Sequence, residues 1–251
     1  MFKDHFSRYA AAYAGHRPDY PETLFDYLAA QANAREVAWD AATGNWQAAH
    51  GLAHHFARVW ATDASAEQMG KAAPHPRVTY RVTPAEVSGL EPASVDLITV
   101  AQALHWFDLQ RFYAEARRVL RAGGLIAVWC YNLMSVSPDI DRVLQVFYAD
   151  TIGTDWPPER RLVEDGYRSL EFPFTEIHDT PAFSIERNWN VEQVLNYVST
   201  WSAVQRYRQR LAVDPVEAHL SLALRDAWGD DNRQRQVHWP IFLRLGVSYN
   251  G

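Results

Sequence analysis

The chain has 251 residues, 48% of them hydrophobic and 22% charged, which suits one globular domain with an appended lid, or at most two small domains. The formal net charge of −6 argues against a nucleic-acid partner, and a single cysteine, Cys130, excludes an intrachain disulfide and fits a reducing compartment. The start of the chain lacks the apolar core of a signal peptide, and no apolar stretch is long enough to span a bilayer. We therefore expect a cytoplasmic protein that binds neither nucleic acid nor membrane, and the sequence leaves its oligomeric state open.

The N-terminal residues 1–31 are expected to form a helical cap in two pieces. Prolines at both ends of the segment 17–21 forbid a continuous helix there. After this break, Leu24, Phe25 and Leu28 recur at helical spacing, which predicts a helix over Glu22–Ala30 with one apolar face.

The next hundred residues alternate between short apolar runs and helical patterns. The expected helices are Gln47–Phe56, Ser65–Lys71 with Ser65 as N-cap, and Asp108–Leu120, which Gly123-Gly124 would close. The expected strands are Glu36–Asp40, Arg58–Asp63, Val78–Val82, Val95–Val100 and Leu125–Tyr131. Uniformly apolar strands that alternate with helices indicate an α/β fold, with a parallel sheet covered on both faces.

The second half of the chain changes character. Helices are expected over 138–152, 191–211 and 215–228, and strands over 172–185 and 237–247. Pro240 lies inside the last strand and suits an edge or a bulge better than a fully paired centre. We divide the chain into the cap 1–31, a cofactor-binding core 32–134, and a segment 135–251 that supplies lid helices and the last two strands.

Polar residues end three of the predicted strands. Asp40 ends the first strand and Asp63 the second, and Gln102 follows the fourth. Ligands of open α/β sheets bind beyond the carboxyl ends of the strands, where strand order reverses. Asp63 lies about 20 residues past the first turn, the spacing of an acid that binds ribose hydroxyls. The alternative is that Asp63 only caps the helix after Ser65.

The segment Asp40–Gln47 reads DAATGNWQ, which does not match GxGxxG, and the chain has no GxxxxGK[ST] loop. Both absences argue against a nicotinamide or flavin dinucleotide and against a P-loop nucleotide site. We expect no metal ion.

Several segments together resemble the class I S-adenosylmethionine-dependent methyltransferases. A strand followed by a DxGxGxG-like loop, then a strand ending in an acid, is that family's pattern. The match continues in AQALHWFD (residues 101–108) and RRVLRAGGL (residues 117–125). The segment 13–21 and the Thr200-Trp201-Ser202 stretch are similar to the methyltransferase type 11 subgroup that includes the trans-aconitate methyltransferases. The resemblance implies a Rossmann-like, mostly parallel seven-stranded sheet with helices on both faces and a helical lid.

The resemblance also implies site residues. Arg17 would neutralise the cofactor carboxylate through a bidentate contact, and Tyr13 would close the site over it. His105 would face the substrate and act as catalytic base, at an ordinary histidine pKa, if the acceptor is a hydroxyl or an amine; a structural hydrogen bond is the alternative. The other implied cofactor-binding residues are Asp40, Ala42, Gly44, Gln47, Asp63, Ala64, Met69, Ala85, Glu86, Gln102 and Trp106. The candidate substrate-binding residues, with packing or a surface position as the alternative for each, are Tyr131, Asn132, Trp156, Arg161 and Trp201.

Two residues depart from the family's glycine-rich loop. Ala42 fits if its φ is negative and otherwise costs on the order of 1 kcal/mol. Trp46 either packs on the entry helix or plugs part of the cofactor site. We expect a methyltransferase of a small molecule, with a carboxylic acid as one candidate. The alternatives are intramolecular alkyl transfer from the same cofactor and a non-catalytic binding protein.

Overall fold

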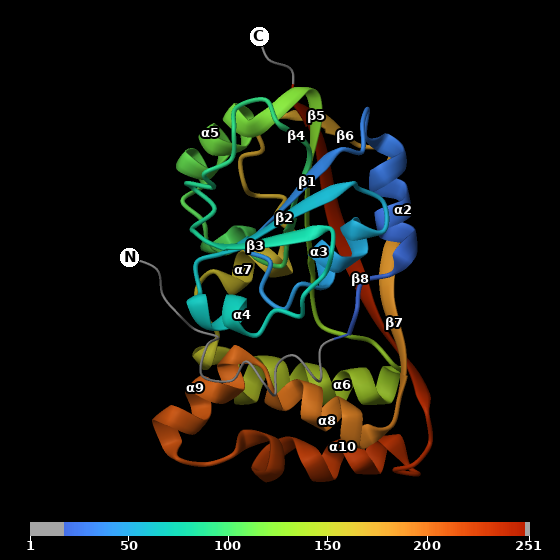
Figure 1. Ribbon diagram of the computed structural model, residues 1–251. Coiled ribbons are helices and arrows are strands. Elements are labelled where there is room, and N and C mark those ends of the chain that lie inside the picture. Colours follow the sequence, from blue (N-terminus) through green and yellow to red (C-terminus); the bar gives the residue numbers. More distant parts are fainter. Residues whose placement is uncertain (1–17, 249–251) are drawn as a thin grey trace.

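The computed structural model describes residues 18–248, so the predicted contacts of Tyr13 and Arg17 lie outside the described residues. These residues form an eight-stranded sheet in the order β3-β2-β1-β4-β5-β8-β6, with β7 also paired to β8 (Figure 1). The first five strands run parallel to one another. They are β1 (Val37–Ala41), β2 (Arg58–Asp63), β3 (Val78–Val82), β4 (Val95–Ala101) and β5 (Leu120–Tyr131).

Strand order reverses at β1, which pairs with β2 on one side and with β4 on the other. Asp40, near the end of β1, is in register with Ala61 of β2 and with Thr99 of β4. The carboxyl ends of the three strands therefore meet at one edge. This agrees with the prediction from the polar residues at the strand ends. This edge is where a ligand of an open α/β sheet binds.

Successive strand residues point to opposite faces of the sheet, and helices cover both faces. In β5, Ala127 and Trp129 belong to the core that includes α2 (Glu22–Gln31) and α3 (Gln47–Ala53). The intervening Val128 belongs to the core that includes α5 (Leu109–Val119). Figure 1 shows α2 and α3 on one side of the sheet and α5 on the other. The apolar residues of β5 thus pack into a core on each face of the sheet, which explains why the strand is apolar throughout.

The helix α5 runs directly into β5, which differs from the expectation that Gly123-Gly124 would close the helix. The register shifts between Val95 and Leu97, whose partners in β5 are Leu120 and Leu125. The residues between these partners form a bulge, and Gly123 has the positive φ of +73° that glycine adopts without strain. The two glycines therefore shape a bulge inside the strand and do not end the helix.

The last strands extend the sheet with antiparallel pairs. Strand β8 (Arg235–Ser248) pairs with β5 on one side, and with β6 (Thr175–Ile177) and β7 (Phe183–Trp189) on the other. The single edge strand expected over 172–185 is therefore two strands, which is why the sheet has eight strands and not seven. Pro240 pairs with Ser184 of β7 one residue beyond the end of the β5 pairing. Within residues 18–248, Pro240 therefore pairs with β7 and not with β5, in agreement with the expectation that proline suits a position that is not fully paired.

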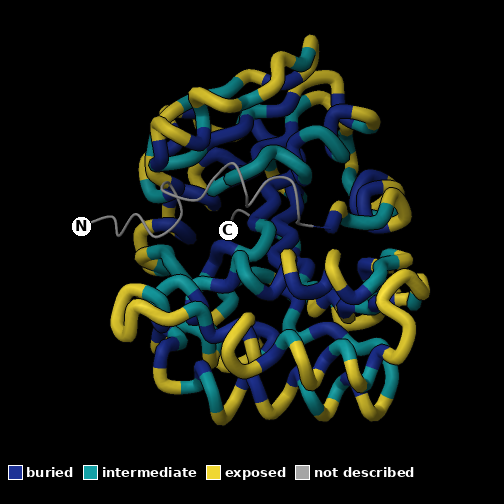
Figure 2. Tube along the Cα trace, turned by 90° about the horizontal axis from the view of Figure 1, so that it is seen from below, coloured by how far each residue is buried: buried dark blue, intermediate teal, exposed yellow. Residues whose placement is uncertain are grey.

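The remaining helices form a layer across the carboxyl ends of the strands (Figure 1). The helices of this layer are α6 (Pro138–Val146), α8 (Val191–Ser199), α9 (Ser202–Leu211) and α10 (Ser221–Trp228). The helix expected over 191–211 is interrupted because Trp201 is extended and its indole is buried against Trp156. The other two expected helices contain π-helical turns at Phe147–Thr151 and Val216–Leu220. Exposed residues concentrate at the periphery of both layers (Figure 2).

The short α-helices are α4 (Ala66–Gly70), after β2, and α7 (Arg160–Glu164), after α6, and 3-10 turns lie at Leu104–Trp106 and Gly153–Asp155. Within residues 18–248, no helix has the length and apolar character needed to cross a membrane.

Candidate cofactor and acceptor site

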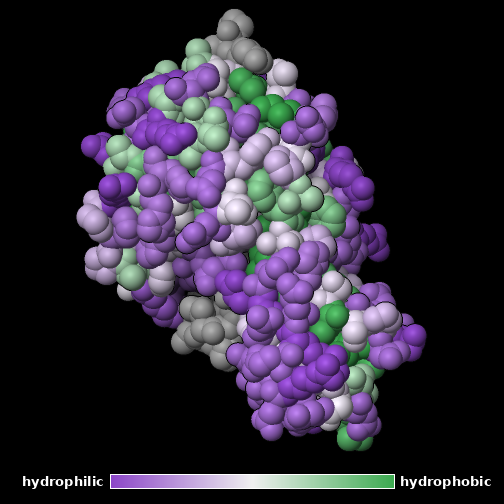
Figure 3. Space-filling model, turned by 90° about the vertical axis from the view of Figure 1, so that its right-hand side faces the viewer, coloured by the Kyte–Doolittle hydropathy of each residue, from purple (hydrophilic) through white to green (hydrophobic). Residues whose placement is uncertain are grey.

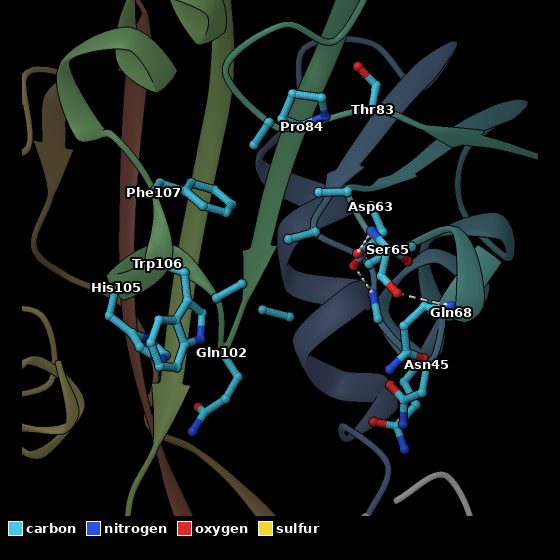
Figure 4. Close-up of a pocket in the computed structure, with 18 of the residues that line it drawn as sticks. Asn45, Asp63, Ser65, Gln68, Thr83, Pro84, Gln102, His105, Trp106 and Phe107 are labelled. Atoms are coloured by element: carbon cyan, nitrogen blue, oxygen red, sulfur yellow. Dashed lines mark hydrogen bonds between the residues drawn. The ribbon is translucent and has the colours of Figure 1, made fainter. Parts of the chain in front are cut away.

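A cavity of about 360 Å³ opens at the carboxyl ends of β1, β2 and β4, a volume in the usual range for small-molecule sites. Asp63, Ser65 and Gln68 lie along one wall, and His105, Trp106 and Phe107 lie along the opposite wall (Figure 4). The sequence-predicted residues that line it are Ala42, Gly44, Gln47, Asp63, Ala64, Ala85, Glu86, Gln102, His105, Trp106 and Tyr131.

The loop between β1 and α3 has three residues with left-handed backbone. The φ values are +56° at Ala42, +52° at Gly44 and +65° at Trp46. The sequence predicts that Ala42 fits without strain if its φ is negative. Its φ is positive, so its backbone is strained, since a side chain at positive φ is disfavoured. A Cβ added at Gly44 would meet no atom within 4 Å, so this part of the loop faces open space.

Trp46 does not line the cavity. It lines a separate depression beside α2, together with Phe25 and His50. This placement agrees with packing toward the entry helix and leaves the cofactor cavity free of the indole.

Asp63 serves the loop as well as the cavity. Its Oδ2 accepts a hydrogen bond from the Gly44 N–H at 3.0 Å, and its Oδ1 accepts one from the Ser65 N–H at 2.8 Å. Ser65 itself caps α4, because its hydroxyl accepts from the Gln68 N–H at 3.3 Å, as the sequence predicted. Each carboxylate oxygen keeps further acceptor capacity, so these bonds do not exclude a ribose.

Two predicted cofactor contacts are not among the residues that line the cavity. Met69 is one of them, and Gln68 lines the cavity in its place, because successive helix residues point about 100° apart. Asp40 is the other: it is fully buried beneath the loop and accepts a hydrogen bond from the Thr99 hydroxyl at 2.8 Å. Burial raises the pKa of Asp40 to about 6, partly offset by its hydrogen bonds.

Gln102 joins the ends of β4 and β5. Its Oε1 accepts from the Tyr131 N–H at 2.8 Å, and its amide nitrogen donates to the Tyr131 carbonyl at 3.1 Å. Its backbone has a φ of +56°, and its N–H donates to the Trp129 carbonyl at 2.8 Å. The side chain at the floor of the cavity is thus held by both strands.

A second, smaller chamber of about 70 Å³ adjoins the first. Both are lined by Gln102, His105, Trp106 and Tyr131, so these residues stand where the two spaces meet. Four predicted substrate-binding residues line the smaller chamber, namely Tyr131, Asn132, Trp156 and Trp201. Pro157, Arg160, Val163, Tyr197 and Ser202 complete much of its wall.

The cation of this chamber is Arg160 and not the predicted Arg161. Arg161 is exposed and is not among the lining residues, because the two neighbours on α7 point in different directions. Arg160 donates through Nε to the Tyr148 hydroxyl at 2.7 Å and through Nη2 to the Asn132 amide oxygen at 2.6 Å. It also lies 4.8 Å from the ring centroid of Trp156. It forms no ion pair with any carboxylate within residues 18–248.

His105 is held by a tyrosine that the sequence did not point to. Its Nδ1 lies 2.7 Å from the hydroxyl oxygen of Tyr167, which is fully buried. Burial, with a smaller contribution from the positive charge of Arg160, lowers the pKa of His105 to about 3. The ordinary pKa assumed from the sequence is therefore wrong, and the ring is neutral at physiological pH.

Several lining residues were missed from the sequence. Thr83 and Pro84 directly follow β3 and could have been found by extending the strand-end argument to a third parallel strand. Phe107 lies inside the AQALHWFD segment. Tyr20, Thr43, Asn45 and Glu159 also line the cavity. Glu159 comes from the segment after α6, and no local sequence pattern marks it.

The residues present fit a nucleoside with an amino-acid arm. The cavity has an acid on its β2 wall, an open loop at Gly44, and the start of α3 at Gln47. A helix start presents unpaired backbone N–H groups to a carboxylate. Within the described chain, no group of three or more His, Cys, Asp or Glu residues could hold a metal ion.

Comparison with known proteins agrees with this geometry. The methyltransferase domain family matches residues 39–128. A Dictyostelium discoideum protein named as a methyltransferase is 31% identical over 251 residues, covering 97% of this chain and 95% of its own length. The structure of a protein described as a type II methyltransferase, from Anaeromyxobacter dehalogenans, has 48% identity and a TM-score of 0.88, covering 94% of this chain and 99% of that chain. This chain therefore belongs to the class I methyltransferases, enzymes whose cofactor is S-adenosylmethionine.

Proposed function

We propose that this enzyme methylates a small molecule that carries a carboxylate, and that the carboxylate oxygen receives the methyl group. The observation that carries the proposal is Arg160, a guanidinium without a carboxylate partner among the described residues, in the chamber beside the cofactor cavity. A guanidinium in an aromatic-walled chamber favours an anionic ligand, because charge-assisted hydrogen bonds strengthen where water is excluded.

S-adenosylmethionine, when bound, supplies a methyl group on a sulfonium, and its transfer to a carboxylate gives a methyl ester and S-adenosylhomocysteine with no proton to remove. The cofactor would be held by residues that line the larger cavity, with Asp63 toward the ribose and the start of α3 toward the carboxylate. Gln102 and Trp106 stand between the two spaces and would orient the acceptor. The lowered pKa of His105 makes its ring a weak base for a hydroxyl, which also favours an acceptor that is already deprotonated.

A screen of small carboxylic acids tests the reaction itself. Each acid is incubated with the enzyme and methyl-labelled S-adenosylmethionine, and labelled methyl ester is measured by mass spectrometry beside S-adenosylhomocysteine. We expect ester from at least one acid and none from the matched primary amide. Label found only in hydroxyl or amine acceptors would contradict the proposal.

The role of Arg160 is tested by comparing Arg160→Gln with Arg161→Gln, a matched change of the exposed neighbour. Hydrogen bonds to charged groups contribute about 1.5–3 kcal/mol, so Arg160→Gln should raise the acceptor KM by about 10- to 100-fold. Arg161→Gln should leave the acceptor KM unchanged, and calorimetry should give both variants the wild-type affinity for the cofactor. Equal KM values in the two variants would remove Arg160 from the acceptor site.

A further inference from the structure

The buried hydroxyl of Tyr167 forms a hydrogen bond with one ring nitrogen of His105. Tyr167 follows α7, is fully buried, and has a left-handed backbone with φ of +61°. The Arg244 guanidinium donates to its carbonyl oxygen at 2.8 Å and so holds this unusual conformation. The phenol oxygen lies 2.7 Å from Nδ1 of His105.

The direction of this hydrogen bond follows from the surroundings of the phenol. A buried hydroxyl hydrogen without an acceptor is costly, and Nδ1 of His105 is the acceptor that the residues 18–248 offer it. The backbone N–H of His105 also interacts with the phenol oxygen, which occupies its acceptor side. Burial raises the pKa of Tyr167 well above its usual value, so the phenol keeps its hydrogen. Tyr167 therefore donates and Nδ1 accepts.

A neutral imidazole carries one ring hydrogen, so a hydrogen-bonded lone pair on Nδ1 leaves that hydrogen on Nε2. Nε2 has no hydrogen-bond partner in the described part of the chain, and it is not one of the buried, unpartnered polar atoms there. The His105 ring lines both the cofactor cavity and the acceptor chamber. Its Nε2–H group is thus the part of the ring available to a bound molecule.

We propose that Tyr167 is a positioning residue that holds His105 in the Nε2–H tautomer, so that His105 donates a hydrogen bond to the acceptor's carboxylate and does not act as a base. Arg160 lines the same chamber, so a charged and a neutral donor face one anion. The identity of the acceptor group rests on the proposed function, whereas the tautomer of His105 does not.

The tautomer is measured directly by NMR on protein labelled with ¹⁵N at histidine, without cofactor or acceptor. The ¹⁵N shifts distinguish a protonated ring nitrogen from an unprotonated one, and His105→Gln identifies the signals of His105 by their loss. We expect Nε2 protonated and Nδ1 unprotonated in the wild type, and a mixture of tautomers in Tyr167→Phe. A wild-type ring with its hydrogen on Nδ1 would overturn the proposal, whatever the substrate.

Kinetics separate a donor from a base. In His105→Gln the side-chain amide can place an N–H near the position of Nε2, whereas His105→Ala has no donor. We expect Ala to raise the acceptor KM by about tenfold or more and Gln to recover much of this loss. If Gln and Ala lose kcat equally at an unchanged KM, His105 is a base. Correct NMR tautomers without any carboxylate turnover would reject the proposed function and leave the tautomer assignment standing.

Discussion

At the scale of single residues, the cofactor loop carries backbone strain that a glycine would remove. The left-handed φ of +56° at Ala42 and of +65° at Trp46 are both at positions where related loops prefer glycine. A non-glycine residue in this region costs roughly 1–2 kcal/mol. Trp46 lines the depression beside α2 and does not line the cofactor cavity.

Replacing Ala42 by glycine should therefore stabilise the protein. We expect Ala42→Gly to raise the free energy of unfolding by about 1 kcal/mol, or the Tm by about 2–4 °C. Ala212→Gly is the matched control, since Ala212 is exposed, has a φ of +55° and lies far along the chain in the lid, at the end of α9. It should give a similar gain. Ala30→Gly, in the exposed part of α2, should lower the Tm, and a fall of the same kind at Ala42 would contradict the strain argument.

The buried Asp40 should make the stability of the protein depend on pH. Its folded-state pKa of about 6 exceeds its usual value of 3.8, because burial disfavours the charged carboxylate. A raised carboxyl pKa contributes stability that is fully present below pH 4 and is lost as the pH rises through 6. Asp40→Asn removes this dependence and keeps an oxygen for Thr99.

Urea denaturation of wild type and Asp40→Asn at pH 4.5 and pH 7.5 measures this effect. The difference in the free energy of unfolding, Asp40→Asn minus wild type, should increase by on the order of 2 kcal/mol from pH 4.5 to pH 7.5. Taking the difference between the proteins cancels the titration of other groups. A difference that does not change with pH would show that Asp40 titrates at its usual value.

At the scale of elements, the site depends on how the end of β4 is joined to the end of β5. Parallel strands leave their carboxyl ends without a connecting turn, and here the Gln102 amide makes the connection through the Tyr131 backbone. The short helix α7 acts in a similar way on the acceptor side, since it presents Arg160 inward and Arg161 outward.

Gln102→Glu tests this connection with almost no change in shape. The new carboxylate keeps an acceptor for the Tyr131 N–H but places an oxygen, where an N–H stood, against the Tyr131 carbonyl. We expect a loss of about 1–3 kcal/mol in the free energy of unfolding, measured by urea denaturation at pH 7.5. Glu67→Gln, an exposed change in α4, should alter stability by less than about 0.5 kcal/mol. Wild-type stability in Gln102→Glu would mean that the amide does not join the strands.

At the scale of the whole molecule, the cavity brings distant parts of the chain together around a ligand. The face in Figure 3 is mostly hydrophilic, with hydrophobic side chains in small scattered groups. The cavity lies at the carboxyl ends of the parallel strands, and a ligand there contacts residues from widely separated parts of the chain, from Tyr20 to Glu159. Ligand binding should therefore raise the free energy of unfolding of the whole domain.

Thermal unfolding with S-adenosylhomocysteine measures this coupling. A ligand at 100 times its Kd adds about 2.7 kcal/mol, which corresponds to a rise in Tm of roughly 5–11 °C for a chain of this size. Asp63→Asn should reduce the rise, because an amide replaces a carboxylate toward the ribose and toward the Gly44 N–H. The same rise in wild type and Asp63→Asn would exclude Asp63 as a ligand contact.

Local pattern determined the α/β class and the existence and order of the first five strands, because apolar periodicity depends only on nearby residues, although β5 begins five residues earlier than expected. The same pattern determined the rim that carries Asp63 and Gln102, because parallel strands end at one edge. It also determined the Ser65 cap and the family to which the chain belongs. Tertiary structure decided that β6 and β7 both pair with β8, which side of α7 faces the chamber, and which residue forms a hydrogen bond with His105. Those features depend on contacts between residues far apart in the chain, such as Tyr167 with His105, and on burial, which moves the His105 pKa away from its ordinary value.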